Sequence, residues 1–180
     1  MGFGCIGMSI PRSYGRPNET ECHKVLTAAA DMDIDFWVTR NAYGPFVNDE
    51  LISRRFKETG RRKAIFLATK FGINVQDTKP RMLVCSKPDH VKEACARSLE
   101  RLNVDYIDLY LQQRVDTDIP IEKTIQAMTE LKDKEKIRNL SLSECCVRTL
   151  ERAHKVHPIA AVGMKISPLL SESNPQRLCF

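Results

Sequence analysis

Apolar residues in this chain alternate between short continuous runs and stretches with helical spacing. The first clear apolar run covers residues 34–38 and ends in a polar turn that carries Tyr43 and Gly44. Further apolar runs predict buried strands at residues 63–69, 105–111, 137–142 and 159–164. Apolar residues spaced three or four apart predict helices at residues 20–32, 48–57, 87–102, 121–134 and 146–154.

The N-terminal residues 2–7 spell the pattern GxGxxG, which occurs in dinucleotide-binding proteins. That fingerprint needs a strand before its first glycine and a helix after its third. Here only Met1 precedes the pattern, and Pro11 follows soon after it. We therefore interpret these residues as a first strand that is rich in glycine.

The order strand, helix, strand predicts an α/β protein with a parallel sheet and right-handed crossovers. Both a doubly wound sheet and a barrel fit this order. A complete (β/α)8 barrel typically needs about 250 residues, whereas this chain has 180 residues and six expected strands. If the fold is a barrel, it is an incomplete one of about six βα units, with strands seven and eight missing.

The N-terminal 168 residues form the expected partial barrel, and residues 169–180 are a tail of unknown structure. Within the barrel, residues 74–86 have the composition of a loop. The next helix is expected to begin with Ser86 as its capping residue and Pro88 in its first turn.

Composition excludes several classes of function. The net charge is +5, but the basic residues are scattered, so we expect no nucleic-acid partner. No apolar run reaches the roughly 18–20 residues of a membrane span, so we expect no membrane partner. The seven cysteines show neither CxxC pairs nor metal spacing, which favours reduced thiols, no metal site and a cytoplasmic location.

Polar side chains follow several of the predicted strands at their carboxyl ends, where parallel α/β folds build active sites. They are Tyr43, Lys70, Gln113 and the pair Ser143 and Glu144. A lysine close to a tyrosine favours the phenolate and lowers the phenol pKa. A phenol tuned in this way can donate a proton during reduction of a carbonyl.

Several motifs together resemble the aldo-keto reductase family. They are Gly-Phe-Gly-Cys-Ile-Gly-Met-Ser at 2–9, Tyr43-Gly44, Ala-Thr-Lys-Phe-Gly at 68–72, Ser-Leu-Glu-Arg-Leu at 98–102, Asp-Tyr-Ile-Asp-Leu-Tyr at 105–110 and Ile-Pro-Ile-Glu at 119–122. Ser143-Glu144-Cys145 and residues 152–158 are similar to the pyridoxal reductase-like branch of fungi and plants.

This resemblance implies a (β/α)8 barrel that uses NADP(H) to reduce an aldehyde or ketone. Tyr43 matches the tyrosine that gives the proton, and Lys70 matches the lysine that lowers its pKa. Val38 stands where the family has the aspartate that pairs with this lysine, and Gln113 stands at the histidine position. Since burial then disfavours the charged lysine, the changes predict weak turnover.

The resemblance also implies the cofactor-binding residues. Gly4, Ser143 and Glu144 match positions near the cofactor, whereas Gly163 replaces a glutamine that would bind the nicotinamide amide. The family strands that carry most contacts to the adenosine phosphate have no counterpart here, nor does the short segment before the first strand. The chain therefore resembles a member truncated at both ends, and we expect weakened NADP(H) affinity.

Three helix ends differ from the family pattern in the same way. Asp33, Asn103 and Glu135 occupy positions where the family has a glycine after a helix. Asparagine and aspartate tolerate the left-handed backbone best among the other residues, while glutamate costs about 1 kcal/mol. Ser141 likewise replaces a glycine of the fifth strand.

Two functions remain open from the sequence. The first is an NADPH-dependent carbonyl reductase with a small-molecule substrate and weak activity. The second is a catalytically inactive fragment or pseudo-reductase, acting as an interaction protein or arising as a degenerate gene product. An incomplete barrel leaves open sheet edges, so the second hypothesis predicts self-association through those edges.

Overall fold

The computed structural model describes residues 1–10, 15, 18–44, 46–73 and 84–165. Its strands form one curled, parallel sheet, in which each strand pairs with the next one along the chain. The six strands are β1 (Gly2–Gly4), β2 (Phe36–Val38), β3 (Phe66–Phe71), β4 (Ile107–Gln112), β5 (Ile137–Ser143) and β6 (Ala161–Gly163). This arrangement confirms the α/β class and the partial barrel of about six units.

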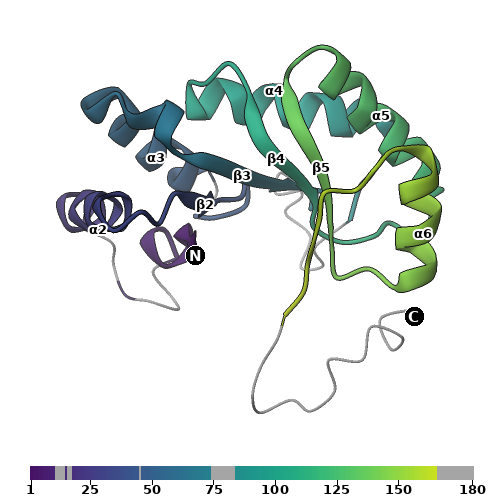
Figure 1. The fold of residues 1–180 in the computed structure, drawn as a ribbon, viewed down its shortest axis with the longest axis horizontal. Coiled ribbons are helices and arrows are strands. Elements are labelled where there is room, and N and C mark those ends of the chain that lie inside the picture. The colour runs from purple at the N-terminus through teal and green to yellow at the C-terminus, as the bar shows by residue number, and fades with distance from the viewer. Residues whose placement is uncertain (11–14, 16–17, 45, 74–83, 166–180) are drawn as a thin grey trace.

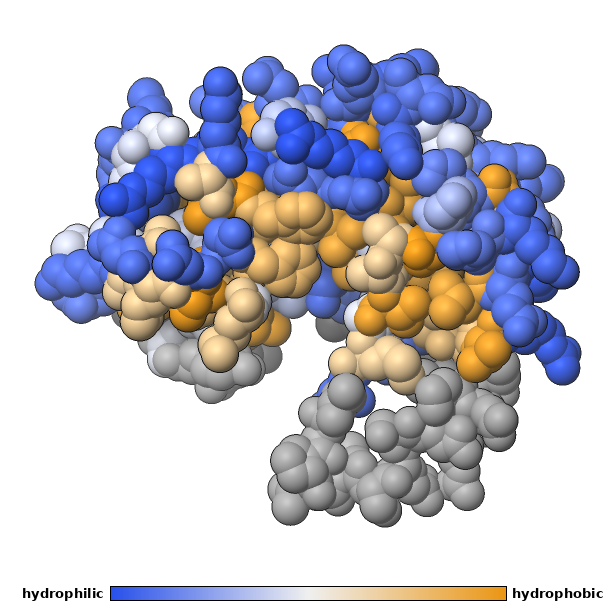
Figure 2. Space-filling view, in the orientation of Figure 1, coloured by the Kyte–Doolittle hydropathy of each residue, from blue (hydrophilic) through white to orange (hydrophobic). Residues whose placement is uncertain are grey.

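Helices connect successive strands and lie against the sheet (Figure 1). The α-helices are α2 (Glu19–Asp31), α3 (Val47–Thr59), α4 (Pro88–Leu102), α5 (Ile121–Asp133) and α6 (Val147–Val156). Two short 3₁₀ helices, η1 (Cys5–Met8) and η2 (Arg61–Ala64), complete the described elements. Figure 2 shows hydrophilic residues over α4 and α5 at the top of the view, with hydrophobic residues gathered below them.

The predicted elements are confirmed, with two local corrections. The first strand ends at Gly4, because the chain turns into η1 at once. Ser86 does not cap α4, since Lys87 occupies that position without a side-chain cap. The Ser86 hydroxyl instead accepts a hydrogen bond of 2.6 Å from the Gln112 amide. Most of the predicted loop and the tail 169–180 lie outside the described residues.

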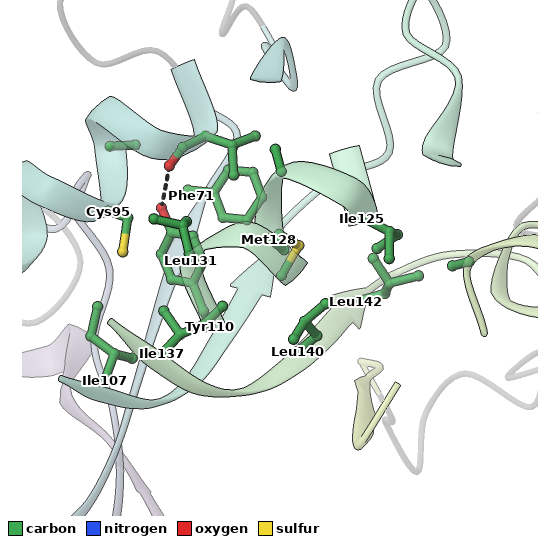
Figure 3. Close-up of a cluster of buried hydrophobic side chains, with 14 of the residues drawn as sticks. Phe71, Cys95, Ile107, Tyr110, Ile125, Met128, Leu131, Ile137, Leu140 and Leu142 are labelled. Carbon is green, nitrogen blue, oxygen red and sulfur yellow. Dashed lines mark hydrogen bonds between the residues drawn. The ribbon is translucent and has the colours of Figure 1, made fainter. Parts of the chain in front are cut away.

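The largest part of the core lies between α4, α5 and strands β3 to β5 (Figure 3). Phe71 stacks on Tyr110 with a centroid separation of 4.6 Å. The Tyr110 hydroxyl donates to the Val91 carbonyl at 3.3 Å, which satisfies its polar end inside the core. A second cluster fills the N-terminal half, where Trp37 stacks on Phe56 at 5.8 Å.

Cysteine chemistry partly follows the sequence expectation. Cys5, Cys22, Cys85, Cys95 and Cys145 are free thiols, and all but Cys85 are buried. Burial raises the pKa of Cys5 to about 12, so that thiol is inert at neutral pH. Cys146 is disulfide-bonded, so the expectation of reduced thiols does not hold for it.

The three helix ends at which the family pattern has glycine adopt the left-handed backbone that this pattern predicts. The φ angles are 56° at Asp33, 51° at Asn103 and 56° at Glu135. Glutamate has neither the freedom of glycine nor the short polar side chain that helps asparagine in this region. Glu135 is therefore the most strained of these helix ends.

Replacing Glu135 by glycine should raise the free energy of unfolding by about 1 kcal/mol, because it removes the left-handed penalty. Denaturant titration of the purified chain measures this change. Asn103→Gly is the matched control and should change stability by only a few tenths of that amount. A Glu135→Gly variant that is less stable than the parent would contradict the strain.

Candidate active site

The strand register places the predicted site residues that lie on strands on one face of the sheet. Val38 lies opposite Gly4 on one side and Ala68 on the other. Lys70 lies two residues beyond Ala68, so its side chain projects on the same face as that of Val38. Val38 packs there against an apolar cluster of strand residues that contains Ala68 and Leu111.

Ser143 and Gly163 share this face at the other end of the sheet. They are register partners between β5 and β6. A Cβ atom added to Gly163 would lie 3.5 Å from the Ser143 Oγ and 3.7 Å from the Leu111 Cδ2. Since Leu111 also pairs with Lys70, the structure brings Ser143, Gly163 and Lys70 onto a common surface.

Tyr43 lies in the turn that follows β2 and is 9% exposed. Gly44 is required beside it, because its φ is 67° and a Cβ there would approach the Ser9 carbonyl oxygen to 2.4 Å. Asn48 holds the turn in place: its amide donates to the Cys5 carbonyl at 2.7 Å and the Ser9 hydroxyl at 2.8 Å. The Thr39 hydroxyl donates to the Asn48 side-chain oxygen at 2.7 Å. This buried network makes the position of Tyr43 well defined.

Lys70 is a partly buried ammonium at the end of β3. Burial lowers its pKa, the positive charge of Arg40 lowers it further, and Glu144 acts in the opposite direction. Val38 provides no carboxylate and only apolar contact. The lowered pKa agrees with the expectation that Lys70 lacks the charge partner found in the family.

Gln113 follows β4 directly, and its backbone N–H donates to the Phe71 carbonyl at 2.9 Å. Its side-chain oxygen Oε1 is buried and has no hydrogen-bond partner among the described residues. A buried amide oxygen without a partner costs free energy unless a ligand or water satisfies it. Gln113 therefore has unused hydrogen-bonding capacity at the site.

Glu144 follows Ser143 and also has a left-handed backbone, with φ of 53°. Its N–H donates to the Gly163 carbonyl at 2.8 Å. Its carboxylate accepts from the Lys165 N–H at 2.7 Å and lies 3.6 Å from the Arg114 guanidinium. Glu144 thus joins the ends of β4, β5 and β6.

Arg40 and Arg114 are site residues that the sequence reasoning missed. Arg40 is 9% exposed and lies 5.7 Å from the centroid of the Tyr43 ring. Burial lowers its pKa, while Tyr43 raises it and Arg114 lowers it. The sequence signal for Arg40 was its position between β2 and Tyr43, in a stretch (residues 36–44) that contains no acidic residue.

Gly163 and Ser143 are the residues of this face that could hold the nicotinamide end of a cofactor. Gly163 has no side chain, so a planar group can lie against the strands next to the buried Ser143. Gly4 is the register partner of Val38 on β2. A Cβ atom added to Gly4 would meet no atom within 4 Å, so the space beside it is open. The described residues contain no group of three or more metal-ligating side chains.

Among the described helices, none is long and apolar enough to cross a membrane.

Comparison with known proteins identifies the family of this chain. A sequence model of the aldo/keto reductase family matches residues 1–180. "Aldo-keto reductase yakc [NADP(+)]" of Schizosaccharomyces pombe is 42% identical over 172 residues, covering 96% of this chain and 50% of that protein. "Aldo-keto reductase str7" of Strobilurus tenacellus is 45% identical over 184 residues, covering 100% of this chain and 52% of that protein. The chain thus spans about half the length of these curated relatives.

Solved structures give the same answer for the fold. The holo form of aldo-keto reductase AKR11C1 from Bacillus halodurans superposes with a TM-score of 0.81 at 30% identity, covering 93% of this chain and 53% of that one. Glycerol dehydrogenase AKR11B4 from Gluconobacter oxydans gives 0.80 at 25% identity, covering 92% and 50%. On its sequence match and its six barrel units, this chain belongs to the aldo/keto reductase family.

Proposed function

We propose that this chain takes part in NADPH-dependent reduction of an aldehyde or ketone to an alcohol. The observation that carries the proposal is the position of Tyr43 and Lys70 at the ends of the neighbouring strands β2 and β3. The Arg40 guanidinium lies 5.7 Å from the Tyr43 ring centroid, and its charge lowers the Lys70 pKa. NADPH would supply the hydride. Tyr43 would donate the proton to the carbonyl oxygen, and Lys70 would stabilise the negative charge left on the phenol oxygen.

The other residues of the site would have supporting roles. The Gln113 amide would bind the carbonyl oxygen, in place of the family histidine. Gly4, Ser143, Glu144 and Gly163 would hold the nicotinamide end of NADP(H). The cofactor assignment is supported by the NADP(+) in the name of the fission-yeast relative. A pyridoxal-like aldehyde is the substrate that the fungal and plant motifs favour, in a cytoplasmic setting.

Turnover is proposed to be slow because two members of the family tetrad are changed. Val38 leaves Lys70 without a carboxylate, and burial together with the positive charge of Arg40 lowers the Lys70 pKa. A general acid and the groups that tune it are together worth roughly 10²- to 10⁴-fold in rate. Restoring the missing pair should therefore raise the rate.

The test combines NADPH binding with turnover in the parent chain and a Val38→Asp, Gln113→His double variant. We expect both proteins to quench NADPH fluorescence with similar affinity. The double variant should reduce pyridoxal or another aldehyde at least about tenfold faster, because Lys70 regains its partner. Absence of NADPH binding in both proteins would contradict the proposal.

The alternative function is a non-catalytic interaction protein that self-associates through its sheet edges. The observation in its favour is that β1 and β6 lie at the two edges of the described sheet. Beside β6 is a groove lined by Leu150, His154, Ile159 and Val162, among others. Light scattering distinguishes the two functions: a dimer or larger species without NADPH binding would support the alternative.

A further inference from the structure

Arg40 is a buried cation whose hydrogen-bonding edge is unused. Its Nε and Nη2 atoms are buried, and neither has a hydrogen-bond partner in the part of the chain that the structure describes. The whole residue is 9% exposed, so bulk water does not compensate for the missing partners. A buried guanidinium without an anion is costly. An external ligand with the right geometry would remove that cost.

The two unpaired nitrogens identify the shape of this ligand. On the same molecule, Arg152 uses its Nε and Nη2 atoms to bind the two carboxylate oxygens of Glu122, each at 2.7 Å. This bidentate geometry is the one in which guanidinium groups recognise carboxylates and phosphates. Arg40 presents the same pair of donors without the carboxylate.

Charges around Arg40 favour an anion as well. Lys70 and Arg114 both contribute positive charge there, as their effects on neighbouring groups show. Glu144 is the one carboxylate that acts on Lys70 within the described residues, and it already lies 3.6 Å from Arg114. Three cations therefore face one shared acid. The site carries a net positive charge that a ligand can neutralise.

We propose that the unpaired edge of Arg40 binds the carboxylate of a small ligand beside Tyr43. If the proposed reductase function holds, the preferred carbonyl substrates carry a carboxylate group, and this part of the inference rests on that function. Binding of the carboxylate itself needs only the folded chain. The two parts can therefore fail separately.

The first experiment is calorimetric titration of the cofactor-free protein with benzoate at constant ionic strength. We expect one saturable site, weakened roughly ten- to a hundredfold by Arg40→Met, since a bidentate charge-assisted contact is lost. Arg40→Lys keeps the positive charge, so it controls for misfolding caused by loss of that charge. It should still lose most of the affinity for benzoate, because an ammonium group cannot form the bidentate contact of a guanidinium. Arg148→Met removes an equal charge at an exposed position and should bind like the parent.

Equal benzoate binding by the parent and both Arg40 variants would overturn the inference, and so would absence of binding. Inorganic phosphate is titrated in parallel, and binding tighter than that of benzoate would overturn the carboxylate assignment. The second experiment compares 4-carboxybenzaldehyde with benzaldehyde in NADPH oxidation. Preference for the carboxylated aldehyde, lost in Arg40→Lys, is expected. Benzoate binding without any turnover would refute the reductase function while leaving the anion site intact.

Discussion

Replacing Tyr43 by phenylalanine is expected to reduce NADPH-dependent carbonyl reduction roughly 10²- to 10⁴-fold. The phenol hydroxyl is the proton donor of the proposed reaction, and general acid catalysis has that magnitude. Phenylalanine keeps the ring that packs in the turn, where Tyr43 is 9% exposed. The loss should therefore appear in turnover, with little change in stability. Initial rates of NADPH oxidation with an aldehyde panel measure it.

The matched control for this substitution is Tyr106→Phe. Tyr106 precedes β4 at the other end of that strand, where the guanidinium groups of Arg62 and Arg138 lie 4.7 and 3.8 Å from its ring centroid. Removing this hydroxyl leaves the proposed site untouched, so the rate should not change. NADPH affinity should be the same in all three proteins. A Tyr43→Phe variant that keeps the parent rate would refute the role of Tyr43.

Replacing Asp108 by alanine is expected to destabilise the fold by about 3–5 kcal/mol, because it breaks a buried ion pair. Asp108 is 4% exposed on β4. Its Oδ2 atom accepts from the Leu67 N–H at 3.0 Å and from the Arg62 guanidinium at 2.8 Å. Its Oδ1 atom accepts from Arg138 at 3.3 Å. One carboxylate thus links β4 to both neighbouring strands, and its loss leaves Arg62 without a counter-ion.

Arg138→Ala provides the comparison for Asp108. The Arg138 side chain is 58% exposed, so its ion pair is screened by water and should contribute no more than about 1 kcal/mol. Denaturant unfolding of the two variants gives both values. Asp108→Asn should fall between them, since the amide keeps one acceptor but loses the charge. Equal effects for Asp108→Ala and Arg138→Ala would show that burial does not strengthen this network.

Element order could be predicted from the sequence because burial imposes period two on strands and period 3.6 on helices. Each apolar run became a parallel strand, and each periodic stretch became the helix that follows it. The three substituted helix ends were also predictable, since a position that needs glycine requires a left-handed backbone. The pyridoxal reductase-like branch and the roles of all the site residues, Tyr43 and Lys70 included, remain predictions.

Side-chain partners could not be predicted, because they depend on which segments the fold brings together. Ser86 has the sequence signature of a helix cap, yet its hydroxyl accepts from Gln112, 26 positions away. Asp108 lies between apolar residues of β4, and only the packing of η2 and β5 beside it gives it two arginines.

The sequence by itself determined the family, the parallel α/β order and the pair of Tyr43 and Lys70 at neighbouring strand ends. Local patterns suffice for these features, since each depends on residues close together in the chain. The tertiary structure alone decided that Arg40 is buried beside Tyr43 with two donors unpaired. Burial and lack of a partner are properties of the whole packed site, and no stretch of sequence encodes them.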